Sequence, residues 1–378
     1  MTRLLLIILL FLISLLTVFK APVYYFWLLA IIVAEYPWIF TGITMLFLAA
    51  GFWVQKYQLT SSLIGLLALI LFLSPVARAY MIAHSLKQNL TTAFGSNSAP
   101  EKGNTTQLPF TFWGMFAGNP HPVNISTFTY VTYPDTSLTL DFYPSKIPGN
   151  KPCVIVVHGG SWSSGDSKQL PELNSYLANK GYHVAAINYR LAPKYQSPAP
   201  VADVKAALNY LRSHAEELKI DTNNFVLLGR SAGAQIAMLA AYTLRDKGLK
   251  AVVDFYGPAD MVWGYSVPAN PLIMDSRLVM RRYLDGSYQH VPQNYAASSP
   301  IAFVSRLTVP TLIIHGENDV LVAYEHSRRL NAKLQENGIK HFWLQLPWAT
   351  HGFDYNINGP GGQLSTYTVE RFLKAVTQ

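Results

Sequence analysis

A serine flanked by two glycines carries the clearest chemical signal in this sequence. Gly229-Arg-Ser-Ala-Gly233 follows an apolar run, Phe225-Val-Leu-Leu228, and precedes an alanine-rich segment typical of a helix. In a Gly-x-Ser-x-Gly turn between a strand and a helix, the serine is strained and its hydroxyl is exposed above the sheet. Glycines are needed because side chains there would collide with the neighbouring strand and helix. The pattern makes Ser231 the candidate nucleophile.

A serine hydroxyl attacks efficiently only when a base removes its proton, and the base is usually a histidine oriented by a carboxylate. Two downstream segments supply these groups, His315-Gly-Glu-Asn-Asp319 and Thr350-His-Gly-Phe353, and each follows a strand-like run. We expect Asp319 to be the acid and His351 the base. The chain order Ser, Asp, His is the one found when a Gly-x-Ser-x-Gly turn belongs to a parallel sheet.

Other side chains compete for the same roles. Glu317 is the alternative acid, and His315 and His341 are the alternative bases. Three further carboxylates are expected to cap helices or hold loops rather than to react: Asp203, Asp254 and Asp354.

Backbone amides near the nucleophile could stabilise the negative charge that develops on an attacked carbonyl oxygen. The apolar run Val154-Ile-Val-Val157 ends in His158-Gly-Gly160, where glycines leave N–H groups free to face a ligand. We expect the N–H groups of Gly159, Gly160 and Ala232 to form this oxyanion hole. His158 is expected to orient the loop and to transfer no proton.

From about residue 126 onward, strand-like runs alternate with helical patterns. Two initial strands followed by strand–helix alternation predict an α/β domain with a mostly parallel sheet covered by helices on both faces. The predicted strands are 127–133, 137–143, 153–157, 182–188, 225–228, 251–255, 309–314 and 341–346, and the predicted helices are 167–180, 201–218, 232–247, 323–337 and 364–376.

Six motifs in this order resemble the α/β-hydrolase superfamily, in particular the hormone-sensitive-lipase-like and bacterial carboxylesterase group. They are His158-Gly-Gly, Asn188-Tyr-Arg-Leu-Ala-Pro193, Asp203-Val-Lys-Ala-Ala-Leu208, Gly229-Arg-Ser-Ala-Gly233, His315-Gly-Glu-Asn-Asp319 and His351-Gly-Phe353. The resemblance implies a serine esterase that needs neither cofactor nor metal, with Ser231, Asp319 and His351 as its triad. It covers residues 126–378 and leaves the first 100 residues unexplained.

The chain departs from this family at three positions, which weakens any transfer of substrate specificity. Arg230 stands where the family often has an acidic residue or histidine. Ser161 replaces a third glycine, and Ala234 replaces a glycine that is common after the serine turn. The resemblance also implies that a long insertion, at about 258–308, forms a lid or acyl wall. The expected substrate-pocket residues are Trp162, Tyr189, Tyr256 and Trp263.

The N-terminal 80 residues are almost free of charge, and only 13% of the whole chain is charged, against about 25% in ordinary soluble domains. We therefore expect residues 1–86 to form a membrane anchor with about three spans, near 4–19, 23–50 (kinked at Pro37) and 61–83. A removed signal peptide is the alternative for the first stretch, but no small-residue cleavage site follows it. Residues 87–125 are expected to be a linker containing an aromatic segment, 110–116, that packs on the catalytic domain or lies at the membrane interface.

The expected protein is a multi-pass membrane protein with its catalytic domain on the non-cytoplasmic side. A four-span alternative splits the middle segment into 21–34 and 38–54 and moves that domain to the other side. The net charge of +8 forms no basic stripe, so no nucleic-acid partner is expected, and the single cysteine excludes an internal disulfide framework. The sequence does not indicate an oligomeric state.

These features together predict a membrane-anchored serine carboxylesterase that hydrolyses small-molecule or lipid esters through an acyl-enzyme. Two alternatives use the same triad: an amidase or formamidase, and a hydrolase of prenylcysteine or acyl-lipid esters. A hydrolase-like binding protein without enzymatic activity is the remaining alternative.

Overall fold

The computed structural model describes residues 1–53, 55–95 and 108–377. Its described part contains one eight-stranded sheet in the order β1-β2-β4-β3-β5-β6-β7-β8. β2 pairs antiparallel with β1 and with β4, and the remaining neighbours are parallel. The strands are β1 (Ser126–Tyr133), β2 (Thr136–Tyr143), β3 (Lys151–Val157), β4 (His183–Ile187), β5 (Ile220–Arg230), β6 (Leu249–Phe255), β7 (Thr311–Gly316) and β8 (His341–Leu346). This architecture confirms the predicted α/β-hydrolase fold.

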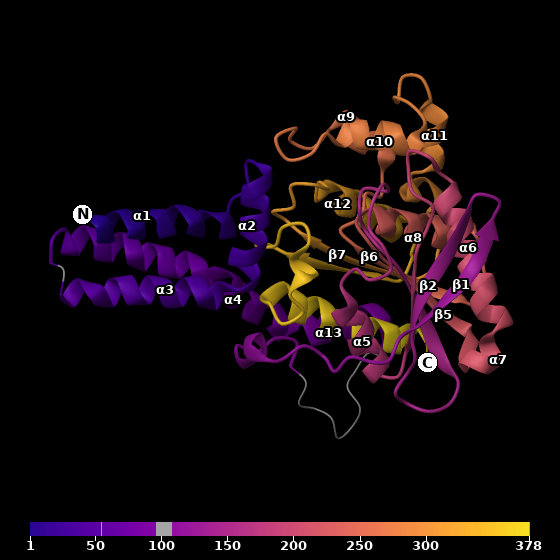
Figure 1. Cartoon of the computed structure of the whole chain (residues 1–378), viewed down its shortest axis with the longest axis horizontal. Helices are drawn as coiled ribbons and strands as arrows, with labels where there is room; N and C mark the ends of the chain where they lie inside the picture. Colours follow the sequence, from indigo (N-terminus) through magenta and orange to yellow (C-terminus); the bar gives the residue numbers. More distant parts are fainter. Residues whose placement is uncertain (54, 96–107, 378) are drawn as a thin grey trace.

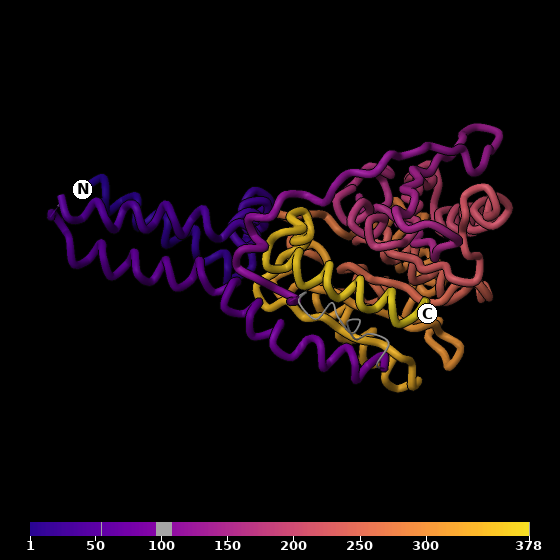
Figure 2. The backbone as a smooth tube through the Cα atoms, turned by 90° about the horizontal axis from the view of Figure 1, so that it is seen from below, coloured from indigo at the N-terminus to yellow at the C-terminus, as the bar shows by residue number. Residues whose placement is uncertain are grey.

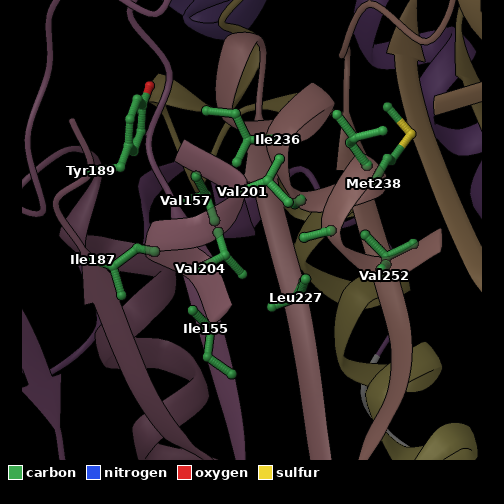
Figure 3. Close-up of a cluster of buried hydrophobic side chains, with 14 of the residues drawn as sticks. Ile155, Val157, Ile187, Tyr189, Val201, Val204, Leu227, Ile236, Met238 and Val252 are labelled. Atoms are coloured by element: carbon green, nitrogen blue, oxygen red, sulfur yellow. The ribbon is translucent and has the colours of Figure 1, made fainter. Parts of the chain in front are cut away.

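The central strands are apolar throughout because helices cover both faces of the sheet. Along β3, Cys153, Ile155 and Val157 belong to one buried cluster, whereas Val154 and Val156 belong to the other. Figure 3 shows part of the first cluster, in which side chains of the sheet meet those of the helices above it.

Helices pack on both clusters. α6 (Ala199–Ser213), α8 (Ala232–Thr243) and α12 (Glu325–Glu336) cover the face of Ile155, and α5 (Pro171–Asn179) and α13 (Pro360–Val376) cover the opposite face. A short helix, α7 (Ala215–Leu218), follows α6, so the helix expected over 201–218 is interrupted at His214. The insertion between β6 and β7 contains α9 (Met261–Ser266), α10 (Ser276–Leu284) and α11 (Pro292–Ala297), which lie together at one end of the domain (Figure 1).

The N-terminal part is an elongated helical bundle that projects from the domain (Figures 1 and 2). α1 (Thr2–Ser14), α3 (Pro37–Ala49) and the first part of α4 (Gln58–Phe94) run along it, while α2 (Tyr24–Glu35) lies across its junction with the domain. Within the described ranges, one helix, α4, is long and apolar enough to cross a membrane, and the α2–α3 pair would be a second only if counted as one span.

The segment expected as one span over 23–50, kinked at Pro37, is broken into two helices at that proline. α2 and α3 meet at an angle of 85°, because Tyr36 leaves the helical conformation and Pro37 starts a new helix. Proline fits the first turn of a helix but disfavours helical geometry in the residue before it. α1 with its short extension, Thr2–Thr17, is as long as the predicted first span, 4–19, but it is too short to count among the helices that could cross a membrane by themselves.

The expected linker over 87–125 is partly helical. α4 continues to Phe94 because Leu86, Leu90 and Phe94 recur every four residues and are buried in the cluster beneath the sheet. Phe94 lies 4.9 Å from Phe372 of α13, measured between ring centroids, and Figure 2 shows the two helices side by side. Residues 96–107 of the expected linker lie outside the described part of the chain.

The aromatic segment 110–116, expected either to pack on the catalytic domain or to lie at the membrane interface, is only partly buried against the domain. Phe110 and Met115 are buried against the domain, whereas Trp113 and Phe116 are exposed. The Phe116 ring lies 5.1 Å from that of Trp38 in α3, so the segment joins the domain to the bundle.

Candidate active site

Ser231 occupies a strained turn between β5 and α8. Its φ is 54°, a value that costs a non-glycine residue energy and persists only where the surroundings impose it. The turn requires both of its glycines: a Cβ on Gly229 would lie 2.3 Å from the Gly233 carbonyl oxygen, and one on Gly233 would lie 2.2 Å from the Val157 carbonyl oxygen. α8 begins at Ala232, so the positive end of the helix dipole lies beside the serine.

The three expected reactive side chains lie together. His351 Nε2 is 2.9 Å from Ser231 Oγ, and His351 Nδ1 is 2.7 Å from Asp319 Oδ2. A carboxylate only accepts, so Nδ1 carries the proton and the Nε2 lone pair faces the serine hydroxyl. This is the geometry in which the imidazole can take the hydroxyl proton.

Asp319 is fully buried but well supplied with donors. Its Oδ1 accepts from the amides of Leu321 and Val322, at 2.8 and 2.9 Å, and its Oδ2 also accepts from His315 Nε2 at 3.1 Å. Burial alone would raise the pKa of this carboxyl, but His351 and His315 outweigh burial and hold the pKa below its usual range. Asp319 is therefore ionised at neutral pH.

The competing residues lie elsewhere. Glu317 is exposed, and His341 is hydrogen bonded to the Ile339 carbonyl at the start of β8. His315 lies behind Asp319, where its Nδ1 contacts Ser327 Oγ at 2.6 Å. It supports the carboxylate and does not contact the serine.

The structure places Asp203, Asp254 and Asp354 in loop-holding positions. Asp203 pairs with Arg190 at 2.9 Å. Asp254 accepts from the Gly257 amide at 2.7 Å, and burial raises its pKa to about 8.

Of the three amides expected in the oxyanion hole, Gly159 is already engaged. Its N–H donates to Gln169 Oε1 at 2.7 Å, so the prediction that it is free for an oxyanion is wrong for this structure. Within the described residues, the amides of Gly160 and Ala232 have no such partner. The Ser161 amide, which the prediction omitted, is free in the same sense and belongs to a residue that lines the cavity beside Ser231.

His158 holds the loop that carries these amides. Its ring stacks on Tyr189 at 4.3 Å between centroids, and its Nδ1 lies 2.7 Å from the Gly159 carbonyl. Burial lowers its pKa, so the ring is neutral. These contacts agree with the orienting role expected for His158.

A cavity of about 440 Å³ opens beside Ser231 and Ala232. The insertion supplies much of its lining, including Met261, Ile273, Met274, Val279 and Met280. Among the four expected pocket residues, only Trp162 lines it; its ring stacks on Tyr283 and its Nε1 donates to Gln235.

The other three expected pocket residues do not line this cavity. Tyr189 is buried behind His158, and its hydroxyl donates to the His158 carbonyl. Tyr256 lies behind His351, with ring centroids 4.4 Å apart. Trp263 belongs to α9 but lines a different hollow, together with Arg329. Its ring also contacts His326, which lines the cavity beside Ser231.

Two supporting features had no clear signal in the sequence. Arg230, noted only as a departure from the family, is buried and donates to Asp354 at 2.6 Å, and Asp354 also accepts from the Tyr256 hydroxyl. This network joins the serine turn to the loop that follows His351. The second feature is the N-terminal segment Lys20-Ala-Pro22, which lines the cavity although it lies more than 200 residues from Ser231 in sequence.

No metal centre accompanies this site in the described ranges, where no three His, Cys, Asp or Glu side chains are grouped to hold an ion.

The fold and the arrangement of Ser231, Asp319 and His351 define an α/β-hydrolase. The model of the BD-FAE family matches residues 140–334, and the chain belongs to that family. Several of the curated relatives are from Mycobacterium tuberculosis, among them the two that follow. Esterase LipQ is 31% identical over 226 residues, which cover 56% of this chain and 52% of LipQ. Esterase LipC is 31% identical over 261 residues, which cover 64% of this chain and 63% of LipC.

The matches thus span between about half and two thirds of those relatives. Among solved structures, a bacterial heroin esterase aligns with a TM-score of 0.60 at 20% identity, covering 81% of this chain and 98% of that chain. A truncated carbohydrate esterase from gut microbiota aligns with a TM-score of 0.55 at 24% identity, covering 68% of this chain and all of that one. At these identities, the structural matches bear on the fold alone.

Proposed function

We propose that this chain is a membrane-anchored serine carboxylesterase. Ser231 Oγ attacks the ester carbonyl carbon while His351 Nε2 takes its proton. The tetrahedral intermediate then breaks its bond to the alkoxy oxygen, and His351 returns the proton to the departing alcohol. Water, activated by the same imidazole, attacks the acyl-enzyme and releases the acid. The observation that carries this proposal is the continuous contact from Ser231 through His351 to Asp319, at 2.9 and 2.7 Å.

The amides of Gly160, Ser161 and Ala232 are the donors we propose for the developing oxyanion. Removing one such donor typically costs about 10²- to 10³-fold in rate. The Gly159 amide donates to Gln169 Oε1 instead, and it is therefore not among the proposed oxyanion donors. The mechanism requires no cofactor.

The test is hydrolysis of 4-nitrophenyl butyrate by full-length protein in detergent. Ser231→Ala should abolish turnover, and Ser213→Ala, an exposed serine at the end of α6, should leave it unchanged. Undiminished turnover in Ser231→Ala would refute the proposal. Faster turnover of the matching anilide or formamide would favour the amidase alternative, and no turnover of any acyl substrate would favour a binding protein.

The proposed anchor is the bundle formed by α1, α3 and the first part of α4. Large apolar side chains are exposed along all three helices, for example Leu9, Leu46, Leu59 and Ile70, and the apolar window of α4 is only 33% buried. Exposed apolar surface on this scale indicates a membrane or partner surface. The esterase relatives do not bear on this point.

Figure 1 shows the N-terminus at the end of the bundle farthest from the catalytic domain. A bundle that crosses the bilayer would therefore separate Met1 from the active site. We propose the non-cytoplasmic side for the catalytic domain. A membrane-impermeant fluorophosphonate should then label Ser231 in intact cells, and labelling only after permeabilisation would place the domain in the cytoplasm.

A further inference from the structure

The segment that joins α1 to α2 forms part of the wall of the cavity beside Ser231. Lys20, Ala21 and Pro22 line it together with the insertion. Two hydrogen bonds fix the segment there: Asn270 Nδ2 donates to the Pro22 carbonyl at 2.9 Å, and the Tyr24 amide donates to the Leu272 carbonyl at 3.2 Å. The helical bundle is thus joined directly to the cavity.

The cavity itself is suited to an apolar chain. Alanine, valine, isoleucine, leucine, methionine and proline side chains provide most of its lining, and the titratable lining residues are Lys20, Asp319 and His326. Asp319 is engaged with His351, and burial, with smaller contributions from His315 and Arg329, lowers the pKa of His326 to about 3, so that ring is neutral. Apart from Asp319, the one charged side chain in the described lining is Lys20, which is exposed.

Exposed apolar and aromatic side chains surround this part of the wall. Phe19, Tyr25 and Phe26 project from the junction of α1 and α2, with exposed fractions of 62%, 78% and 48%. Leu272, on the insertion side of the same junction, is 67% exposed. Aromatic side chains with adjacent positive charge are typical of the zone where a protein meets lipid headgroups.

We infer that the active site takes its substrate from the membrane surface, and that the substrate is an amphiphilic ester with a long apolar acyl chain. This inference rests on the proposed esterase function. The junction of bundle and domain lies at the headgroup level, and the acyl chain enters between Lys20-Ala-Pro22 and the insertion. Lys20 contacts the polar end of neighbouring lipids while the ester carbonyl reaches Ser231.

The test uses full-length protein reconstituted in phosphatidylcholine vesicles. 4-Nitrophenyl palmitate is placed either in the same vesicles as the protein or in separate vesicles, and 4-nitrophenyl acetate serves as the water-soluble comparator. 4-Nitrophenyl palmitate exchanges slowly between vesicles, so it should be hydrolysed at least tenfold faster when it is in the same vesicles as the protein than when it is in separate vesicles. 4-Nitrophenyl acetate should be hydrolysed at the same rate in both arrangements.

A substitution in the wall provides a second measurement. Ala21→Phe narrows the passage beside the anchor, so the ratio of palmitate to acetate hydrolysis in the same vesicles should fall at least tenfold. Ala117→Phe makes the same change at an exposed position outside the cavity lining and should leave the ratio unchanged. Labelling by a fluorophosphonate checks that both variants retain a folded site.

The outcomes separate this inference from the proposed function. If Ser231→Ala removes acetate hydrolysis but palmitate is hydrolysed equally from either vesicle population, or not at all, the substrate does not come from the bilayer and the inference is overturned. An unchanged ratio in Ala21→Phe overturns the route past the anchor. Loss of the esterase proposal itself would appear as acetate hydrolysis that does not depend on Ser231.

Discussion

Trp27, in α2 of the N-terminal bundle, should influence the rate of the chemical step through the backbone of His351. Its indole Nε1 donates to the His351 carbonyl oxygen at 3.0 Å, and its ring lies 6.5 Å from the imidazole. Trp27→Phe keeps an aromatic ring at this position but removes the donor. The loop that carries His351 then loses one of the hydrogen bonds that fix the imidazole opposite Ser231.

The expected magnitude follows from the single bond removed. A neutral hydrogen bond contributes about 1 kcal/mol net, and about 1 kcal/mol corresponds to about a fivefold change in rate when it is lost only in the transition state. We therefore expect kcat for 4-nitrophenyl butyrate to fall about fivefold, with KM changed less than twofold, because the cavity lining is untouched.

The assay compares steady-state kinetics of full-length protein and variants in the same detergent. Trp53→Phe is the matched control, since Trp53 is 81% exposed in the bundle and should leave kcat unchanged. A purely structural role for Trp27 would lower the fraction of labelled enzyme without changing kcat per labelled site. An unchanged kcat per site in Trp27→Phe would refute the argument that the anchor positions His351.

Three further changes test other parts of the site and its supports. Asp319→Asn should lower kcat about 10³- to 10⁴-fold, because a neutral amide neither enforces the required imidazole tautomer nor stabilises the imidazolium. Glu35→Ala should lower the free energy of unfolding by about 2 kcal/mol, because the Glu35 carboxyl accepts from the buried Gly361 amide and Trp348 indole; Glu35→Gln should cost less. Burial lowers the pKa of His326 from 6.5 to about 3. Between these values the folded protein keeps this ring neutral while the unfolded chain binds a proton on it. The contribution of His326 to stability is therefore present above pH 6.5 and is lost as the pH falls toward 3. Between pH 7.5 and pH 5 this loss should be about 2 kcal/mol, and His326→Gln should remove that part of the pH dependence.

Each of these predictions has a measurement and a contrary result. Steady-state kinetics of Asp319→Asn within tenfold of the native enzyme would contradict the assigned acid. Thermal unfolding in detergent measures Glu35→Ala, and an unchanged midpoint would show that α2 is not anchored through this carboxyl. Urea unfolding at several pH values compares His326→Gln with His290→Gln, an exposed histidine; identical profiles would contradict the role of buried His326.

The sequence was sufficient for the sheet and for the central side chains, since these depend on local patterns. Buried parallel strands are continuous apolar runs, and the turn around Ser231 requires glycine at two fixed positions. The ends of strands β7 and β8 then bring residues 319 and 351 to the same edge as residue 231.

The wall of the cavity could not be read from local patterns because it depends on side-chain direction and distant packing. Tyr189 belongs to one of the six motifs and Tyr256 directly follows strand β6, yet both lie behind the site, where each contacts a histidine. Gly159 matched the pattern of a free amide, but the side chain of Gln169, ten residues later, occupies it. The place of Lys20-Ala-Pro22 in the cavity wall could not be predicted either, because it depends on how the helical bundle packs on the catalytic domain.

The helical boundaries show the same limit. Hydropathy marks residues 23–50 as one apolar stretch, whereas Glu35 is held by the domain and Pro37 restarts the helix, so the chain turns sharply there. Burial against α13 likewise extends α4 beyond the end of its apolar window.

The most direct test of the account is the mass of the protein trapped during turnover. Full-length protein mixed with 4-nitrophenyl butyrate and quenched in acid within milliseconds should gain the mass of one butyryl group, and peptide mapping should locate it on Ser231. Ser231→Ala should gain none, and His351→Ala should gain it far more slowly. Turnover without any adduct on Ser231, or an adduct on another residue, would contradict a mechanism in which this serine attacks the ester.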